Sequence, residues 1–152
     1  MSIILSADRD PTCHAIATFL AEQLSNLSAT EIEIGTVLDY DGMVGGAALN
    51  FPLLQVYRLG SKGTYLETST FNIDYYLYSA AAYAERPGIL RLVEVAIAHL
   101  LQDKLPYHGL SELVRLRVEG SDRGFLKLDS GEIFPHTRMT LQVQEINVTS
   151  PL

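Results

Sequence analysis

The sequence predicts one α+β domain over residues 1–152, with a mixed, mainly antiparallel sheet and two main helices packed on one face. Two stretches carry apolar residues at helical spacing, and several others alternate apolar and polar residues as strands do. Short turns join consecutive strand-like stretches, which is typical of antiparallel pairing. We expect the order helix, strand, loop, two strands, helix and three strands.

The first helix is expected over about Pro11 to Asn26. Asp10 is placed to cap it, and proline is favoured at the first helical position. A short strand is expected at Ile32 and Ile34, which alternate with glutamates. The glycine-containing loop that follows, 39–50, is long, and loops of this length are commonly functional.

The middle of the chain predicts a hairpin. One strand is expected from Pro52 to Leu59, then a glycine-containing turn, and then a strand over about Thr70 to Ser79. The second strand has one apolar face, predicted to be core, and one polar, tyrosine-bearing face that another layer or another subunit would cover. The apolar face consists of Phe71, Ile73, Tyr75 and Leu77, and the polar face of Asn72, Asp74, Tyr76 and Tyr78.

The C-terminal half predicts a second helix over about Pro87 to Asp103, whose wide apolar stripe indicates cover on more than one side. The segment from Leu113 to Val118 forms either a short strand or a turn. A hairpin is expected in which the segments Phe125 to Leu128 and Glu132 to Phe134 flank a turn at Asp129-Ser130-Gly131. The last strand is expected from about Arg138 to Ile146, with alternate residues facing inward.

The composition excludes some function classes. The net charge is −7 and the 11 Lys and Arg residues are scattered singly, so we expect no nucleic-acid binding as the main activity. An acidic surface would, however, let DNA pass without adhering. The single cysteine, Cys13, rules out an intramolecular disulfide and fits a reducing compartment. Neither a signal peptide nor a membrane span is expected from the apolar pattern.

Each candidate for a chemical site fails on spacing, so we expect no catalytic, cofactor-binding or metal-binding residues. Asp39-Tyr40-Asp41-Gly42 lacks the later ligands of a calcium loop, and the glycines after it lack the spacing of a phosphate cradle. Cys13 and His14 are neighbours on a helix and point about 100° apart. His99 and Asp103 are predicted to pair at a helix end, and His108 and His136 lack nearby ligands. Carboxylates distant in sequence can still meet for acid–base chemistry.

One stretch of the chain resembles a known family. Phe51-Pro52-Leu53-Leu54-Gln55-Val56-Tyr57 precedes a Gly-Ser-Lys-Gly turn and Thr64-Tyr65-Leu66-Glu67-Thr68, and then comes the polar-faced strand from Phe71 to Tyr78 and a long helix. This pattern resembles the tail terminator (minor tail protein U-like) family of tailed phages. The order of elements is similar over most of the chain, although residues 114–134 are richer in strand than that family implies, which also fits a related neck or head–tail joining protein.

The resemblance implies a structural virion protein, not an enzyme, assembled in the host cytoplasm. It would form a ring, usually of six subunits, that caps the tail tube, ends its polymerisation and meets the neck or connector protein, while DNA passes through the lumen without specific binding. The loops at 39–50 and 61–68 would make contacts along the tube axis, and the second helix and the tyrosine-bearing face would make ring contacts. The candidate interface residues are Tyr40, Met43, Lys62, Tyr65, Tyr76 and Tyr78.

Two other functions remain open at this point. A small metabolic enzyme or ligand-binding domain would use a cleft near His108 and His136, and it requires a deep apolar pocket with convergent polar groups. An adaptor would bind a different protein through the second helix. These alternatives differ from the terminator in predicting no homo-oligomeric ring.

Overall fold

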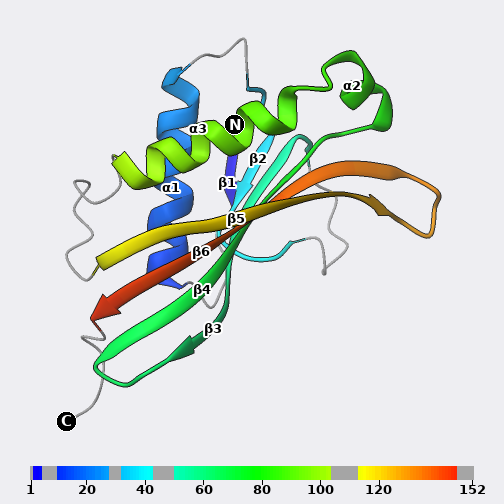
Figure 1. Cartoon of the computed structure of the whole chain (residues 1–152). Coiled ribbons are helices and arrows are strands. Elements are labelled where there is room, and N and C mark those ends of the chain that lie inside the picture. Colours follow the sequence, from blue (N-terminus) through cyan, green and yellow to red (C-terminus); the bar gives the residue numbers. More distant parts are fainter. Residues whose placement is uncertain (1, 5–9, 28–31, 43–49, 104–112, 147–152) are drawn as a thin grey trace.

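The computed structural model describes residues 2–4, 10–27, 32–42, 50–103 and 113–146. Its elements run in the order β1 (Ser2–Ile4), α1 (Pro11–Leu27), β2 (Thr36–Leu38), β3 (Leu53–Lys62), β4 (Leu66–Tyr76), α2 (Ala80–Glu85), α3 (Ile89–Asp103), β5 (Leu113–Lys127) and β6 (Ile133–Ile146). The described strands form one sheet in the order β1-β2-β3-β4-β6-β5 (Figure 1). The β1–β2 and β2–β3 pairs are parallel and the other three pairs are antiparallel, which confirms the α+β prediction.

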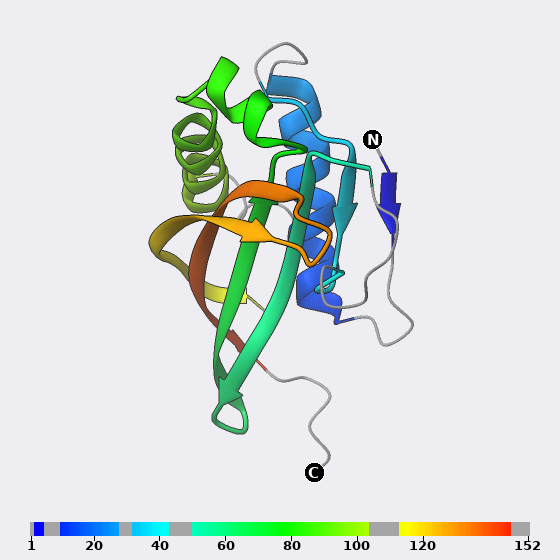
Figure 2. The same cartoon turned by 90° about the vertical axis from the view of Figure 1, so that its right-hand side faces the viewer.

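The main core lies between the sheet and a layer formed by α1 and α3 (Figures 1 and 2). Apolar side chains of both helices, among them Leu20 and Ile97, pack against one face of the central strands. Both predicted helices are therefore confirmed on one side of the sheet, with α1 ending one residue later and α3 starting two residues later than expected. The wide stripe of α3 packs inside the monomer: Leu90, Val93, Ile97, Leu100 and Leu101 are buried, and Leu92 and Ala96 are partly buried against the same core.

Strand β4 is the centre of the antiparallel part, because β3 and β6 pair with its two edges. The predicted core face is confirmed, since Phe71, Ile73, Tyr75 and Leu77 are all buried. On the other face, the chain itself buries Asn72, Asp74 and Tyr76.

A second apolar cluster explains the burial of Tyr76. It lies on the face of the sheet away from α1 and α3 and contains Leu38, Leu53, Tyr76 and Phe134. Phe51 stacks on Phe134 with ring centroids 4.5 Å apart. This end of the outer face is therefore covered by the chain's own residues, whereas none of the helices that the structure describes lies over the opposite end (Figure 2).

Several elements differ from the sequence-based expectations. The strand expected at Ile32 and Ile34 lies instead at Thr36–Leu38, where all three residues are buried and no alternation is visible. Parallel strands covered on both faces lose the alternation that reveals a strand. Helix α2 was not expected, because it has no buried residue and therefore no apolar stripe in the sequence. Its start is marked by Ser79 as N-cap, whose hydroxyl accepts a hydrogen bond from the backbone N–H of Ala82 over 3.1 Å.

The remaining differences concern strand length. Strand β5 spans 15 residues at the edge of the sheet and joins two segments that were expected separately, the short strand or turn from Leu113 to Val118 and the hairpin arm from Phe125 to Leu128. Leu116 and Val118 alternate with charged residues and pack against the core, but Gly120-Ser121-Asp122-Arg123-Gly124 carries no apolar residue, so the pattern does not reveal that the strand continues. Strand β4 starts four residues before Thr70, and β6 starts at Ile133, so both hairpins are longer than predicted.

Candidate functional site

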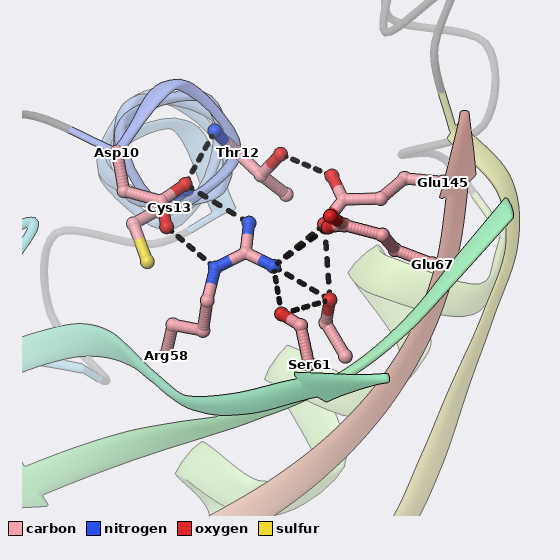
Figure 3. A network of polar contacts seen from close by, with 8 residues as sticks. Asp10, Thr12, Cys13, Arg58, Ser61, Glu67 and Glu145 are labelled. Atoms are coloured by element: carbon pink, nitrogen blue, oxygen red, sulfur yellow. Dashed lines mark hydrogen bonds and ion pairs between the residues drawn. The ribbon is translucent and has the colours of Figure 1, made fainter. Parts of the chain in front are cut away.

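A partly buried cation, Arg58, organises the base of the β3–β4 hairpin. Arg58 of β3 donates through Nε to Asp10 Oδ2 over 2.6 Å and through Nη1 to Glu145 Oε1 over 2.8 Å (Figure 3). The Glu67 carboxylate is 3.9 Å from the same guanidinium nitrogen. One guanidinium thus joins the start of α1, the end of β6 and both strands of the hairpin.

The same network begins helix α1. The Asp10 carboxylate accepts the backbone N–H groups of Thr12 at 3.0 Å and Cys13 at 3.2 Å, which confirms the predicted cap. Burial alone would raise the pKa of Asp10, but hydrogen bonds from Arg58 and from the Cys13 backbone outweigh burial and hold that pKa below its usual value. Arg58 keeps its charge because its bonds to Asp10 and Glu145 oppose the desolvation that would lower its pKa.

The hairpin that Arg58 anchors extends past the N-terminal start of α1 (Figures 1 and 2). Its turn requires glycine, since Gly63 has φ +103° and a Cβ there would lie 2.3 Å from the Leu66 carbonyl oxygen. The exposed residues at this end include Lys62, Tyr65 and Leu66, with Tyr65 68% exposed. The Arg58 network therefore fixes the direction in which an apolar tip is presented.

A polar surface lies on the outer face of the sheet near the hairpin. Thr68 of β4, Gln142 and Gln144 of β6, and Arg115 and Arg117 of β5 line a hollow of about 90 Å³. The register brings Thr68 opposite Gln144, and Gln144 opposite Arg115. This surface can accept hydrogen bonds from a partner, but it has no buried charged group.

Asp74 forms a second network on the outer face, under the start of the 39–50 loop. Its carboxylate accepts two hydrogen bonds from Arg138, at 2.8 and 3.2 Å, and one from Tyr57 at 2.9 Å. It also accepts from the Gln55 amide at 3.0 Å, while the Gln55 carbonyl accepts from the Gly42 backbone at 3.0 Å. Gln55 thereby ties the first residues of the loop to the sheet.

Glu94 links α3 to the β5–β6 hairpin. Arg123 donates to its two carboxylate oxygens over 2.7 and 3.0 Å, and the Thr137 hydroxyl donates over 2.8 Å. Burial would raise the pKa of Glu94, but these hydrogen bonds hold it below its usual value. Both hairpins are thus held to the helical layer by a charged group, Arg58 in one case and Glu94 in the other.

The predicted interface residues divide into three groups. Lys62, Tyr65 and Tyr78 are exposed on the monomer, and Tyr40 is half-buried against the second apolar cluster. Tyr76 is a correction: its side chain is 4% exposed, because the chain's own second cluster covers it, so it does not face another subunit. Met43, together with residues 44–49 of the predicted loop, lies outside the described residues.

The histidines and the cysteine occupy structural positions. His14 Nδ1 is 3.3 Å from buried Asp39, and exposed His99 pairs with Asp103 over 2.8 Å as expected. His136 stacks on Tyr76 with ring centroids 4.9 Å apart, and its pKa is lowered mainly by burial. His108 lies outside the described residues. Within the described ranges, no three His, Cys, Asp or Glu side chains gather as metal ligands would.

Comparisons with known proteins do not assign the chain to a family. No model of a known protein family matches the chain, and no curated protein matches its sequence. None of the helices formed by the described residues is long and apolar enough to cross a membrane.

Arg58, Glu145, Asp74 and Glu94 are the organising residues that the sequence reasoning missed. For two of them, Arg58 and Glu145, the sequence contains a signal that could have identified them. Arg58 falls in step with the inward residues Leu54 and Val56, and Glu145 continues the inward series of Leu141 and Val143. A charge at an inward position near a strand end indicates a partner from another element.

The thiol of Cys13 should react slowly in the folded protein. Burial raises its pKa to about 12, so at pH 8 the thiolate fraction falls roughly a thousandfold below that of a free cysteine. We expect labelling by a disulfide reagent at pH 8 to be at least about a hundredfold slower in the native protein than in denaturant. Equal rates in the two states would contradict the burial of this thiol.

Proposed function

We propose that this chain is a structural virion protein of a tailed phage, a tail terminator that forms a ring, with six subunits as the expected number. The ring would cap the tail tube, end its polymerisation and join the tail to the neck or connector protein. The named residues then serve assembly and not catalysis. The proposal takes its family from the resemblance of the segment from Phe51 to Tyr78.

The observation that carries the proposal is the placement of exposed apolar side chains. Of the eight large apolar side chains that the described residues expose, six lie at the two ends of the antiparallel strands: Tyr65 and Leu66 at one end, and Tyr78, Phe125, Leu128 and Ile133 at the other. Apolar patches flanked by polar residues are typical of protein–protein contacts. Patches at two ends of one chain are what a repeating assembly needs.

Two further observations support assembly over small-molecule chemistry. Two hollows formed by described residues measure about 90 and 50 Å³, whereas ligand pockets usually measure about 300–1,000 Å³. The enzyme alternative places a cleft near His108 and His136. His108 lies outside the described residues, and His136, which stacks on Tyr76, lines neither of these two hollows. The net charge of −7 fits a lumen through which DNA moves without adhering.

The proposal is tested by the particle that the purified protein forms. We expect mass photometry across a concentration series, followed by electron microscopy, to show closed rings of uniform subunit number. Rings that cosediment with assembled tail tubes and shorten the tubes formed in a polymerisation mixture would support a terminator. A protein that remains monomeric at the highest soluble concentration, and that leaves tube length unchanged, would overturn the proposal.

A further inference from the structure

The two apolar ends of the sheet are too far apart to meet within one copy. The register sets Leu66 opposite Ile146 at one end of β4 and Tyr76 opposite His136 at the other. Ten residue steps along a strand cover about 33 Å. Figure 1 shows the β3–β4 and β5–β6 hairpins pointing to opposite sides of the molecule. Any contact between the two ends therefore involves a second molecule.

The first end is a narrow projection, which we call the tip: Lys62, Tyr65 and Leu66. Tyr65 and Leu66 stand beside the Gly63 turn with their side chains largely in solvent. The tip carries one positive charge, because Lys62 is exposed. The neighbouring Glu67 carboxylate lies 3.9 Å from the Arg58 guanidinium, so its negative charge is balanced by Arg58 and not by Lys62. The tip thus presents two apolar side chains and one cation on a projecting hairpin.

The second end is concave, and we call it the hollow. It measures about 50 Å³, and its walls come from the end of β4, from helix α2 and from nearby segments; the lining residues are Glu33, Pro52, Tyr75, Leu77, Tyr78, Ala82, Glu85, Arg86 and Ile89. Tyr78 is 50% exposed at its rim. On the same helix, Tyr83 meets Phe125 edge to face at 6.1 Å, so an apolar surface continues onto β5.

The tip and the hollow are complementary in size and charge. A hollow of about 50 Å³ admits the end of one side chain and excludes a drug-sized ligand. Its charged residues are two glutamates and one arginine, a formal balance of −1, facing the single positive charge of Lys62. Aromatic side chains such as Tyr65 and Tyr78 are enriched at the centres of interfaces.

We propose that the tip of each copy docks in the hollow of the next copy, with the Tyr65 or Leu66 side chain between Tyr78 and α2. The contact joins two different surfaces, so it is heterologous and closes into a ring when the rotation per subunit divides a full turn. This inference rests on the proposed ring and assigns the tip to the contact between subunits. It departs from the expectation that residues 61–68 contact the tube along its axis.

The test uses three variants of the full chain. Tyr65→Asp places a charge on the exposed tip, and Ala82→Arg fills the hollow with a good helix former. Each should weaken self-association at least about thirtyfold, the effect of losing one strong interface residue. Val95→Asp is the matched control, since it alters an exposed apolar residue of α3 outside both surfaces and should leave the rings intact. Circular dichroism checks that all three variants fold.

Mixing the two disabled variants gives the decisive result. Tyr65→Asp retains a working hollow and Ala82→Arg retains a working tip, so the mixture should form a one-to-one dimer although each variant alone is monomeric. Mass photometry at a concentration where the wild type is fully assembled measures this directly. Mixtures that stay monomeric would overturn the tip–hollow contact.

The same measurements separate this inference from the proposed function. If the wild type forms rings that Tyr65→Asp and Ala82→Arg leave intact, the tip–hollow contact is wrong and the ring function stands. If such intact Tyr65→Asp rings no longer bind the tail tube, the tip contacts the tube along its axis, as expected from the sequence. A wild type that forms only a closed dimer, dissolved by either variant, would support the contact and contradict the ring. A wild type that is monomeric throughout contradicts both.

Discussion

Replacing Arg58 with methionine should lower the free energy of unfolding by about 3 kcal/mol, because it leaves partly buried carboxylates without their cation. Arg58 is 24% exposed, and Asp10 and Glu145 lose a charge-assisted partner at 2.6 and 2.8 Å respectively. Methionine retains much of the apolar volume of the side chain, so the loss reports the charge and its hydrogen bonds. Urea unfolding followed by circular dichroism measures the difference.

Arg117→Met is the matched control for this prediction. Arg117 also pairs with a glutamate at 2.7 Å, but its side chain is 56% exposed and lies on the edge strand β5. Exposed pairs of this kind contribute between zero and about 1 kcal/mol, so the control should unfold close to wild type. If both substitutions cost the same, burial of the Arg58 network would not be what makes it important.

The cost of Arg58→Met should shrink as the solution is acidified. In the wild type the pKa of Asp10 lies below its usual 3.8, so the stability that its ionised form contributes is present above that pH and is lost as pH falls through the folded pKa. Without Arg58 the folded pKa is no longer depressed. The two proteins should therefore differ most near pH 7 and converge as the pH falls below 3.8 and through the lowered folded pKa of Asp10. A gap that stays constant from pH 7 to pH 3 would contradict the assignment.

The pattern of apolar and polar residues was sufficient to predict those helices and strands that have one solvent-exposed face and one buried face. Helix α1 was predicted from its cap and stripe, and β4 from four buried residues on alternate positions. Strand β2 was misplaced, because a strand buried on both faces has no alternation. Helix α2 was missed because six residues without a buried side chain carry no periodicity.

The charged networks could be anticipated only in part, for a different reason. Arg58 and Glu145 are 87 positions apart in the chain, and their meeting depends on β6 pairing beside β4, which the order of elements alone does not determine. The sequence does contain one signal on each strand: a charged residue occupies the next alternate position after two inward-facing apolar residues. The sequence indicated single residues of the tip and the hollow, Lys62, Tyr65 and Tyr78, but not their places at opposite ends of the sheet, because that separation follows from the strand register.

Removing the charge of Asp74 should be the other strongly destabilising change. Asp74→Asn retains the shape of a fully buried side chain whose carboxylate accepts from Arg138, Gln55 and Tyr57. An amide nitrogen there would face donors and not acceptors, so we expect a loss of about 2–4 kcal/mol in unfolding free energy. Asp103→Asn is the matched control, since its carboxylate is 57% exposed and pairs only with exposed His99 among the described residues, and it should change stability by less than about 0.5 kcal/mol.

Tyr57 provides a readout of Asp74 that a general loss of stability would not produce. Burial is the main reason that the pKa of Tyr57 is raised to about 12, and the negative charge of Asp74 and its hydrogen bond to the phenol raise it further. Asp74→Asn should therefore lower the Tyr57 pKa, which appears as earlier phenolate absorbance on alkaline titration. Subtracting the titration of a Tyr57→Phe variant isolates this residue from the other tyrosines. An unchanged Tyr57 pKa in folded Asp74→Asn would mean that Asp74 acts on stability through Arg138 and Gln55 alone.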